Sequence, residues 1–160
     1  MLSAYLIRMI ENHAEDLTRE VLDDLSRNPK TPSFHALSRD QLHSRVYDLY
    51  HNLGHWLADM SEEAVERTYT ALGRTRHIER VPMSEVLYAT LLLKDHLRNF
   101  IRRAGVVYSA LELHREVELN LMVGHFFDKA LYYTVKGYEE AVAAARSTSQ
   151  AAAHASSRPA

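Results

Sequence analysis

The stretch that decides the fold is Ser109–Arg146, SALELHREVELNLMVGHFFDKALYYTVKGYEEAVAAAR. Apolar and small residues recur in alternating steps of three and four, the spacing that places side chains along one face of a helix. The predicted stripe consists of Leu113, Val117, Asn120, Gly124, Phe127, Leu131, Thr134, Tyr138 and Ala141. Ser109 and Glu112 have the spacing of a capping box. At about 1.5 Å per residue, this helix would span roughly 55 Å, which is longer than one compact domain requires.

The same alternation predicts four shorter helices before this long one. They run from Ser3 to about Asn28, from Arg39 to Met60, from Ser61 to about His77, and from Ser84 to Arg103. No strand pattern appears, so we predict an all-α fold, either a five-helix bundle or a globin-like helical domain with a long C-terminal helix. Residues 1–146 form this domain. Residues 147–160 are rich in Ala and Ser, and we expect a flexible tail there.

Composition restricts the classes of function. The chain has 160 residues, no cysteine and a formal net charge of −2, so it lacks thiolate chemistry and the basic surface typical of nucleic-acid binding. No apolar run approaches the length of a membrane span, and the N-terminus does not have the layout of a signal peptide. We therefore expect a cytoplasmic protein that binds neither nucleic acid nor membranes.

Two stretches resemble a known family. One is Tyr69-x-x-Leu72-Gly73-Arg74-x-Arg76 followed by RVPMSEVLYA at 80–89; the other is FFDKALYY at 126–133 followed by Gly-Tyr-Glu at 137–139. Both are similar to the N-terminal sensory domain of RsbT co-antagonist (RsbRD-type) proteins. The resemblance implies an all-helical sensor of bacterial signalling proteins, often placed before a STAS or histidine-kinase output module. No output domain follows Tyr138, so we expect a stand-alone or truncated member.

Arg76 is the first candidate for a binding site. It lies on an apolar stripe, where a guanidinium needs a carboxylate, helix carbonyls or an anionic ligand. Glu79 and Glu85 are the nearest acidic partners in sequence, so a structural ion pair and a ligand contact are both open. Gly73 and Pro82 are predicted to bracket a corner between helices, because glycine allows close backbone approach and proline ends a helix.

Aromatic residues supply the other candidate ligand contacts. Tyr69 and Tyr88 belong to a set of tyrosines that would either pack in the core or line a small-molecule pocket. Phe127 lies on the apolar stripe of the long helix, and the space that Gly124 leaves beside it supports the haem alternative below. We therefore propose Arg76, Tyr69, Phe127 and Tyr88 as the candidate ligand-binding residues.

Histidines provide an alternative. The chain has 10 of them, and His13 is predicted to lie centrally on the apolar stripe of the first helix. His13, His96 and His125 are the candidate ligands for haem or a transition metal, although a core imidazole bonded to a backbone carbonyl also explains His13. Hydrolase, metalloprotease and phosphate-loop motifs are missing, so we do not expect an enzyme.

Together these patterns predict a homodimeric sensor domain. It would bind a small ligand or a partner protein and relay the change along Ser109–Arg146 to a signalling partner such as a STAS or kinase module. The alternative is a helical protein that binds haem or metal through core histidines. A purely structural interaction module is the third possibility.

Overall fold

The computed structural model describes residues 4–59, 61–105 and 109–156, and within them the fold is all-α, as predicted. Met60, the predicted end of the second helix, lies outside the described residues. The elements are α1 (Ala4–Asn12), α2 (Ala14–Arg27), the 3-10 helix η1 (Pro32–Ala36), α3 (Arg39–His51), α4 (Leu53–Ala58), α5 (Glu62–Ile78), α6 (Met83–Ala104) and α7 (Ala110–Ser156).

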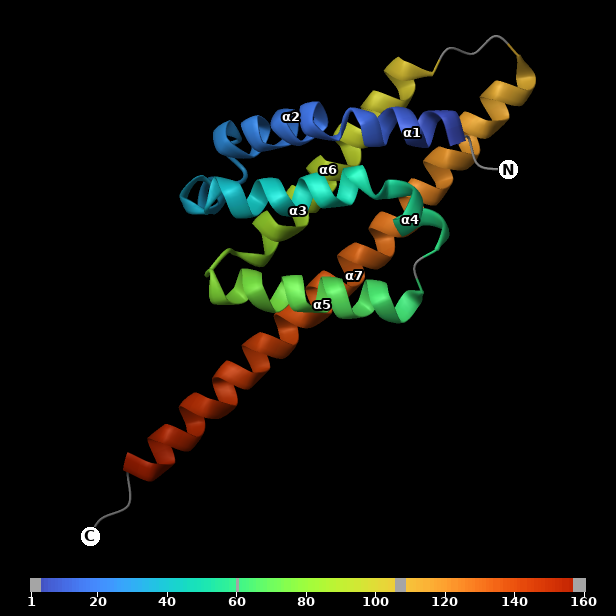
Figure 1. The fold of residues 1–160 in the computed structure, drawn as a ribbon. Coiled ribbons are helices and arrows are strands. Elements are labelled where there is room, and N and C mark those ends of the chain that lie inside the picture. Colours follow the sequence, from blue (N-terminus) through green and yellow to red (C-terminus); the bar gives the residue numbers. More distant parts are fainter. Residues whose placement is uncertain (1–3, 60, 106–108, 157–160) are drawn as a thin grey trace.

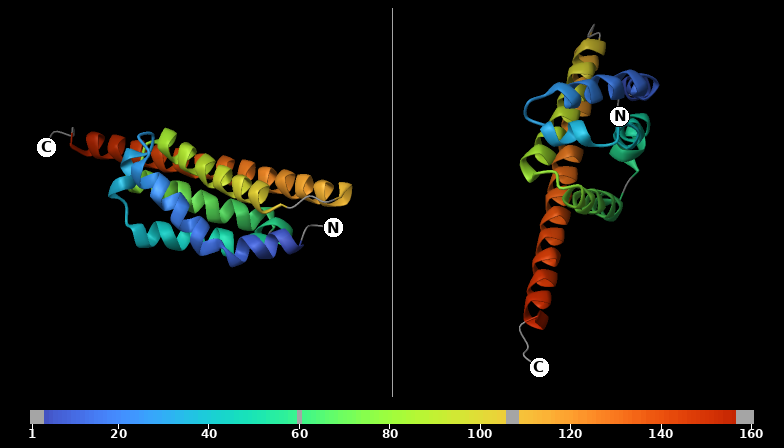
Figure 2. Two further views of the ribbon diagram at one scale, coloured as in Figure 1. Left: turned by 90° about the horizontal axis from the view of Figure 1, so that it is seen from above. Right: turned by 90° about the vertical axis from the view of Figure 1, so that its left-hand side faces the viewer.

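The helices form two layers. The rods α1–α2, α3–α4 and α5 lie side by side in one layer, and α6 and α7 cross behind them (Figures 1 and 2). The most extensive helix–helix contact is between α5 and α7, whereas α3 and α5 barely touch each other although they are neighbours in the front layer. The first two rods of the front layer also pack directly against each other, whereas α5 is attached to the bundle mainly through α7. None of the helices in the described ranges is long and apolar enough to cross a membrane.

Two of the five predicted helices are interrupted by a single residue. His13 separates α1 from α2, and Asn52 separates α3 from α4. In both cases the side chain bonds the carbonyl oxygen four residues earlier: His13 Nδ1 lies 2.7 Å from Met9 O, and Asn52 Nδ2 donates to Asp48 O over 3.0 Å. Such local bonds compete with the regular helix ladder. The apolar periodicity continues across both breaks, so it predicts each pair as one helix.

Pro82 lies at the corner between α5 and α6, as predicted, but Gly73 does not. Pro82 is the N-cap of α6, and the turn is made by Arg80, whose φ of 59° lies in the left-handed region. The amide of Val81 donates to the carbonyl of Arg76, a bond that commonly closes a helix C-terminus. Gly73 lies inside α5, five residues before its end at Ile78, and its role is contact with α7.

The long helix begins as predicted and ends later than predicted. The Glu112 amide donates to Ser109 Oγ over 3.2 Å, which caps the first turn. The predicted end near Arg146 is wrong, because α7 continues to Ser156. Every residue from 143 to 156 is exposed, so this segment contributes nothing to the buried core of the described chain. Flexibility of the tail stays a prediction.

The buried face of α7 shares Phe127 and Thr134 with the predicted stripe and differs from it elsewhere. The residues that are buried are Leu119, Val123, Phe126, Phe127, Ala130, Tyr133, Thr134 and Gly137. Leu113 and Val117, predicted to face the core, are about half exposed, at 51% and 49%. The prediction fails here because α7 carries apolar residues on more than one face, and periodicity alone does not choose between them.

Candidate functional site: a cavity against α5

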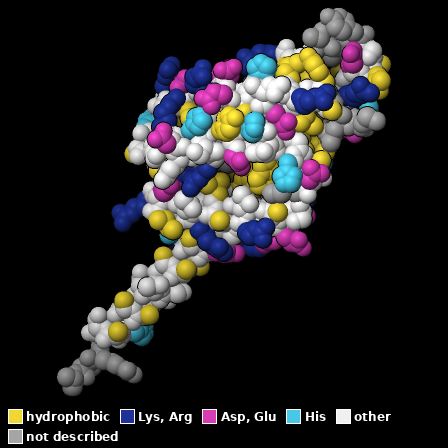
Figure 3. All heavy atoms as spheres, viewed as in Figure 1, with side chains coloured by type: hydrophobic (Ala, Val, Ile, Leu, Met, Phe, Trp, Pro, Cys, Tyr) yellow, Lys and Arg dark blue, Asp and Glu magenta, His cyan; other side chains and the backbone are white. Residues whose placement is uncertain are grey.

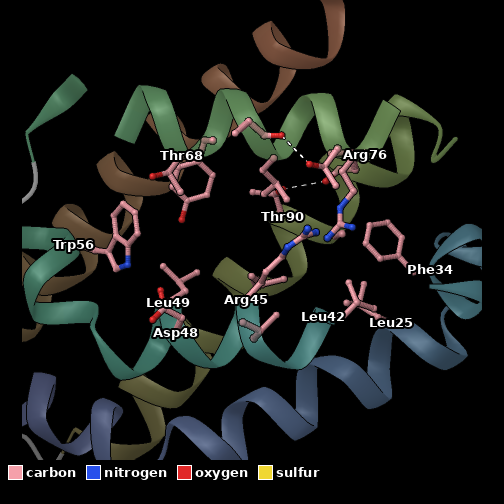
Figure 4. Close-up of a pocket in the computed structure, with 18 residues that line it drawn as sticks. Leu25, Phe34, Leu42, Arg45, Asp48, Leu49, Trp56, Thr68, Arg76 and Thr90 are labelled. Carbon is pink, nitrogen blue, oxygen red and sulfur yellow. Dashed lines mark hydrogen bonds between the residues drawn. The ribbon is translucent and has the colours of Figure 1, made fainter. Parts of the chain in front are cut away.

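A cavity of about 320 Å³ lies between the rods of the front layer, with α6 behind it. Figure 4 shows side chains converging on it from α3 and α5, and Figure 3 shows hydrophobic side chains visible between these two rods. Most of the lining is apolar, as in typical small-molecule sites. The lining residues are Leu25, Phe34, Leu42, Arg45, Val46, Asp48, Leu49, Trp56, Thr68, Tyr69, Ala71, Leu72, Thr75, Arg76, Val86, Ala89, Thr90 and Leu93.

Arg76 reaches this cavity from α5 and is buried, with 6% of its surface exposed. The predicted ion pair is present: Arg76 Nη1 donates to Glu79 Oε2. The guanidinium also lies over the Phe34 ring, 5.3 Å from its centroid. The other predicted partner, Glu85, accepts hydrogen bonds from the amide and hydroxyl of Ser33 instead. Burial lowers the pKa of Arg76, and Glu79 opposes that effect.

Arg45 is a functional candidate that the sequence pattern does not reveal. It lies on the polar side of α3, and in Figure 4 its guanidinium points toward that of Arg76. Within the described part of the chain, no hydrogen bond or ion pair engages the Arg45 guanidinium. Its positive charge adds to the lowering of the Arg76 pKa. No residue spacing links positions 45 and 76, so only the tertiary fold brings them together.

The opposite end of the cavity is aromatic. Trp56 and Tyr69 meet edge to face with their ring centroids 5.7 Å apart, and Phe126 lies 5.8 Å from Tyr69. Burial raises the pKa of Tyr69, and Asp48 raises it further. No described residue forms a hydrogen bond with the Tyr69 hydroxyl. Asp48 also lines this end, and its carboxylate accepts a hydrogen bond from Asn52 over 2.9 Å.

Two of the four predicted ligand-binding residues line the cavity. Arg76 and Tyr69 line it, but Phe127 and Tyr88 do not. Phe127 is buried in the core and packs edge to face against Phe126. Tyr88 lies on α6 beside Lys30, whose Nζ is 5.1 Å from the ring centroid. Helical spacing groups aromatic residues by face, and it does not separate core faces from cavity faces.

The three candidate histidines have different surroundings. The prediction that His13 is buried is wrong: it is exposed at the α1–α2 break, although it bonds a backbone carbonyl as one reading expected. His96 lies 2.9 Å from Asp24 and 3.8 Å from Glu20. His125 is exposed beside a groove between α6 and α7. In the described ranges, no group of three or more metal-binding side chains converges, and no histidine lines the α3–α5 cavity.

The far side of α5 is locked to α7. Each helix has a glycine at the crossing, and each glycine faces the backbone of the other helix. A methyl group on Gly73 would overlap the Thr134 carbonyl and lie 2.8 Å from the Tyr138 nitrogen; one on Gly137 would overlap the Thr70 carbonyl. No side chain fits between the two helices here. Both glycines belong to the stretches that carry the family resemblance.

Polar contacts extend the α5–α7 crossing along both helices. Ion pairs join Glu62 to Lys129, Glu66 to Lys136 and Arg74 to Glu140, at 3.1, 2.9 and 2.7 Å. The order of these pairs shows that α5 and α7 run in the same direction. Beyond the end of α5, the Tyr138 hydroxyl donates to the Val81 carbonyl over 2.8 Å. The two helices thus contact each other from the start of α5 to the corner that follows it.

Comparison of the chain with known protein families, curated proteins and solved structures finds no match.

Proposed function

We propose that this protein is a sensor domain that binds a small ligand in the α3–α5 cavity and relays its presence through α7. The observation that carries the proposal is the double role of α5. One face of this helix supplies a wall of the cavity through Thr68, Tyr69, Leu72 and Arg76. The other face contacts α7 backbone to backbone at Gly73 and Gly137.

The geometry favours movement of α5 and α7 as one unit. The cavity separates α3 from α5, and these two helices barely touch, so a ligand changes their spacing at small cost in lost contacts. The α5–α7 crossing is tightly packed, and packed interfaces resist continuous deformation. A ligand that displaces α5 from α3 therefore displaces α7 as well.

The output end of this relay is the exposed part of α7. Residues 143–156 extend past the bundle, and all of them are exposed (Figure 1). A signalling partner, such as a STAS or kinase module, fits this role. The resemblance to RsbRD-type sensory domains supports the same reading, since its two stretches meet at the α5–α7 crossing.

We further propose that the protein is a homodimer. Leu113, Val117 and Leu121 follow one another at i, i+4 spacing on α7, and they are 51%, 49% and 61% exposed. A contiguous exposed apolar line of this kind is typical of an interface. Light scattering should report a dimer for the native chain and a monomer for Leu121→Glu. A native chain that is monomeric at high micromolar concentration contradicts the dimer.

A ligand screen with a filled cavity tests the sensor function. Leu72 lines the cavity and is not part of the main hydrophobic core, so Leu72→Trp fills the space with little loss of core packing. Leu91→Trp is the matched control, because Leu91 is 39% exposed on α6 and does not line this cavity. A library of neutral, cationic and anionic metabolites is screened by thermal shift.

The proposal expects at least one compound to stabilise the native chain and Leu91→Trp but not Leu72→Trp. If no compound of any charge does so, or if every hit stabilises all three proteins equally, ligand sensing in this cavity is rejected.

A further inference from the structure

We propose that the ligand is a small amphipathic anion, an apolar body bearing one carboxylate, whose carboxylate is bound between Arg45 and Arg76. This inference rests on the proposed function, since it assigns a chemical class to the ligand of the same cavity. It has three supports: the charges at one end, the free hydrogen-bonding capacity there, and the apolar character of the rest.

The end of the cavity near Phe34 is positively charged. Arg45 and Arg76 face each other there (Figure 4), and among the described residues Glu79 is the single carboxylate paired with either. Two like charges brought together cost free energy unless an anion lies between them. The carboxylate that does line the cavity, Asp48, lies on the Trp56 side and already accepts a hydrogen bond from Asn52. Among the described residues, the positive charge of Arg45 is therefore left without an ion-pair partner.

Hydrogen-bonding capacity at this end is also in excess. A guanidinium carries several N–H donors in a planar fork that matches a carboxylate. The hydrogen bonds of the described residues give Arg76 one acceptor, Glu79, and give Arg45 none. A ligand carboxylate would satisfy donors of both residues, and such charge-assisted bonds are the stronger kind.

The remainder of the cavity selects the body of the ligand. Away from the two arginines the lining is mostly aliphatic and aromatic, with Trp56 and Tyr69 at the far end. The volume of about 320 Å³ lies near the lower limit of the roughly 300–1,000 Å³ range of ligand pockets. A medium-length alkyl or aryl-alkyl chain fits these dimensions, and the Tyr69 hydroxyl offers one further polar contact.

The experiment measures calorimetric binding of two carboxylates, decanoate and 4-phenylbutyrate. Each is compared with its neutral alcohol, 1-decanol or 4-phenylbutanol, and decanoate also with the cation decyltrimethylammonium. The variants are Arg45→Gln, Leu72→Trp and Arg67→Gln. Arg67 is the control for loss of charge, because it is exposed on α5, does not line the cavity and pairs with no described residue. Arg45 is exposed, so its substitution leaves the fold intact.

We expect at least one carboxylate to bind the native chain and Arg67→Gln equally. Arg45→Gln should weaken binding by about tenfold, the effect of losing one charged hydrogen bond, and Leu72→Trp should abolish it. The inference is overturned if the alcohol or the ammonium compound binds as tightly as the carboxylate, if Arg45→Gln binds unchanged, if Leu72→Trp still binds, or if neither carboxylate binds. In those cases the sensor function is decided separately by the library screen, in which neutral or cationic hits still support it.

Discussion

Gly137 and Gly124 lie on the same helix, thirteen positions apart, in opposite environments. At Gly137 an added methyl group would overlap the backbone of α5 at Thr70; at Gly124 it would meet nothing within 4 Å. In the sequence both are glycines in a long helical pattern, where glycine costs stability unless something requires it. The structure supplies that requirement at Gly137 and none at Gly124. The comparison shows where α7 is fixed to the bundle and where it borders open space.

The largest effect is expected for Gly137→Ala. Its methyl group forces the backbones of α5 and α7 apart and strains the packing on both sides, which should lower the free energy of unfolding by about 3 kcal/mol. Gly73→Ala should behave alike, because it meets Thr134 in the same way. Urea denaturation measures the change. A loss below about 0.5 kcal/mol in both variants would show that the two helices are not locked at this crossing.

The second-largest loss of stability is expected from a comparison of the two faces of α5, one toward the cavity and one toward α7. Arg76→Leu removes a buried guanidinium and leaves Glu79 without its partner, so we expect a loss of about 2 kcal/mol. Arg74→Leu is the control: Arg74 pairs with Glu140 on the α7 side, but its side chain is 54% exposed, and surface pairs contribute at most about 1 kcal/mol. Equal losses in the two variants would contradict the assignment of Arg76 as a buried cavity residue.

A smaller effect is expected at acid pH, where α2 meets α6. Burial raises the pKa of the Asp24 carboxyl, but hydrogen bonds from His96 and Asn28 and the charge of His96 outweigh burial and hold it below its ordinary value of 3.8. A depressed pKa stabilises the fold at pH values above the ordinary one, and this contribution disappears as pH falls through the folded-state pKa. The contribution should not exceed about 1 kcal/mol, since the carboxylate is partly exposed.

The test compares Asp24→Asn with the native chain in urea titrations from neutral pH downward. The variant should be less stable at neutral pH, and the difference should shrink at pH values below about 3.8. Asp16→Asn, which alters an exposed carboxylate near Arg19, should show neither change. A difference for Asp24→Asn that does not depend on pH would contradict the ion-pair assignment.

The smallest change in stability is expected at Gly124, the second glycine of the comparison. Gly124→Ala introduces no clash and improves helix propensity, so it should raise the free energy of unfolding by about 0.5 kcal/mol. The same urea measurement distinguishes it from Gly137→Ala by the sign of the change. Destabilisation by Gly124→Ala would show that another chain or a ligand approaches the backbone there.

Much of the fold was predictable because helix periodicity is a local property. The five helical segments, the Ser109 cap and the stop at Pro82 all depend on residues within a few positions of each other. The orientation of α7 was not predictable, since Leu113 and Val117 look as suitable for a core as Leu119 and Val123. Which apolar face is buried depends on helices that are distant in sequence.

The candidate site was predictable only in part, for a similar reason. Arg76 was apparent because a charge on an apolar stripe is conspicuous. Arg45 was not, because an arginine on a polar helix face is ordinary until the fold turns it toward Arg76. His13 appeared buried because the apolar pattern continues past it, while its own bond to Met9 breaks the helix and leaves it exposed. Tertiary contacts thus decided the case of Arg45, and a local side-chain bond decided that of His13.

The central claim is that α5 and α7 move together when the cavity is filled, and electron-spin distance measurements test it most directly. The chain has no cysteine, so spin labels are attached at introduced cysteines. The pair Gln41→Cys and Gln150→Cys reports the α3–α7 distance. The pair Glu63→Cys and Gln150→Cys reports the α5–α7 distance. Each pair is measured in the native, Leu72→Trp and Leu91→Trp backgrounds. We predict that Leu72→Trp alone shifts the α3–α7 distance and leaves the α5–α7 distance unchanged. A shift in the α5–α7 distance, or no shift in the α3–α7 distance, would contradict the account.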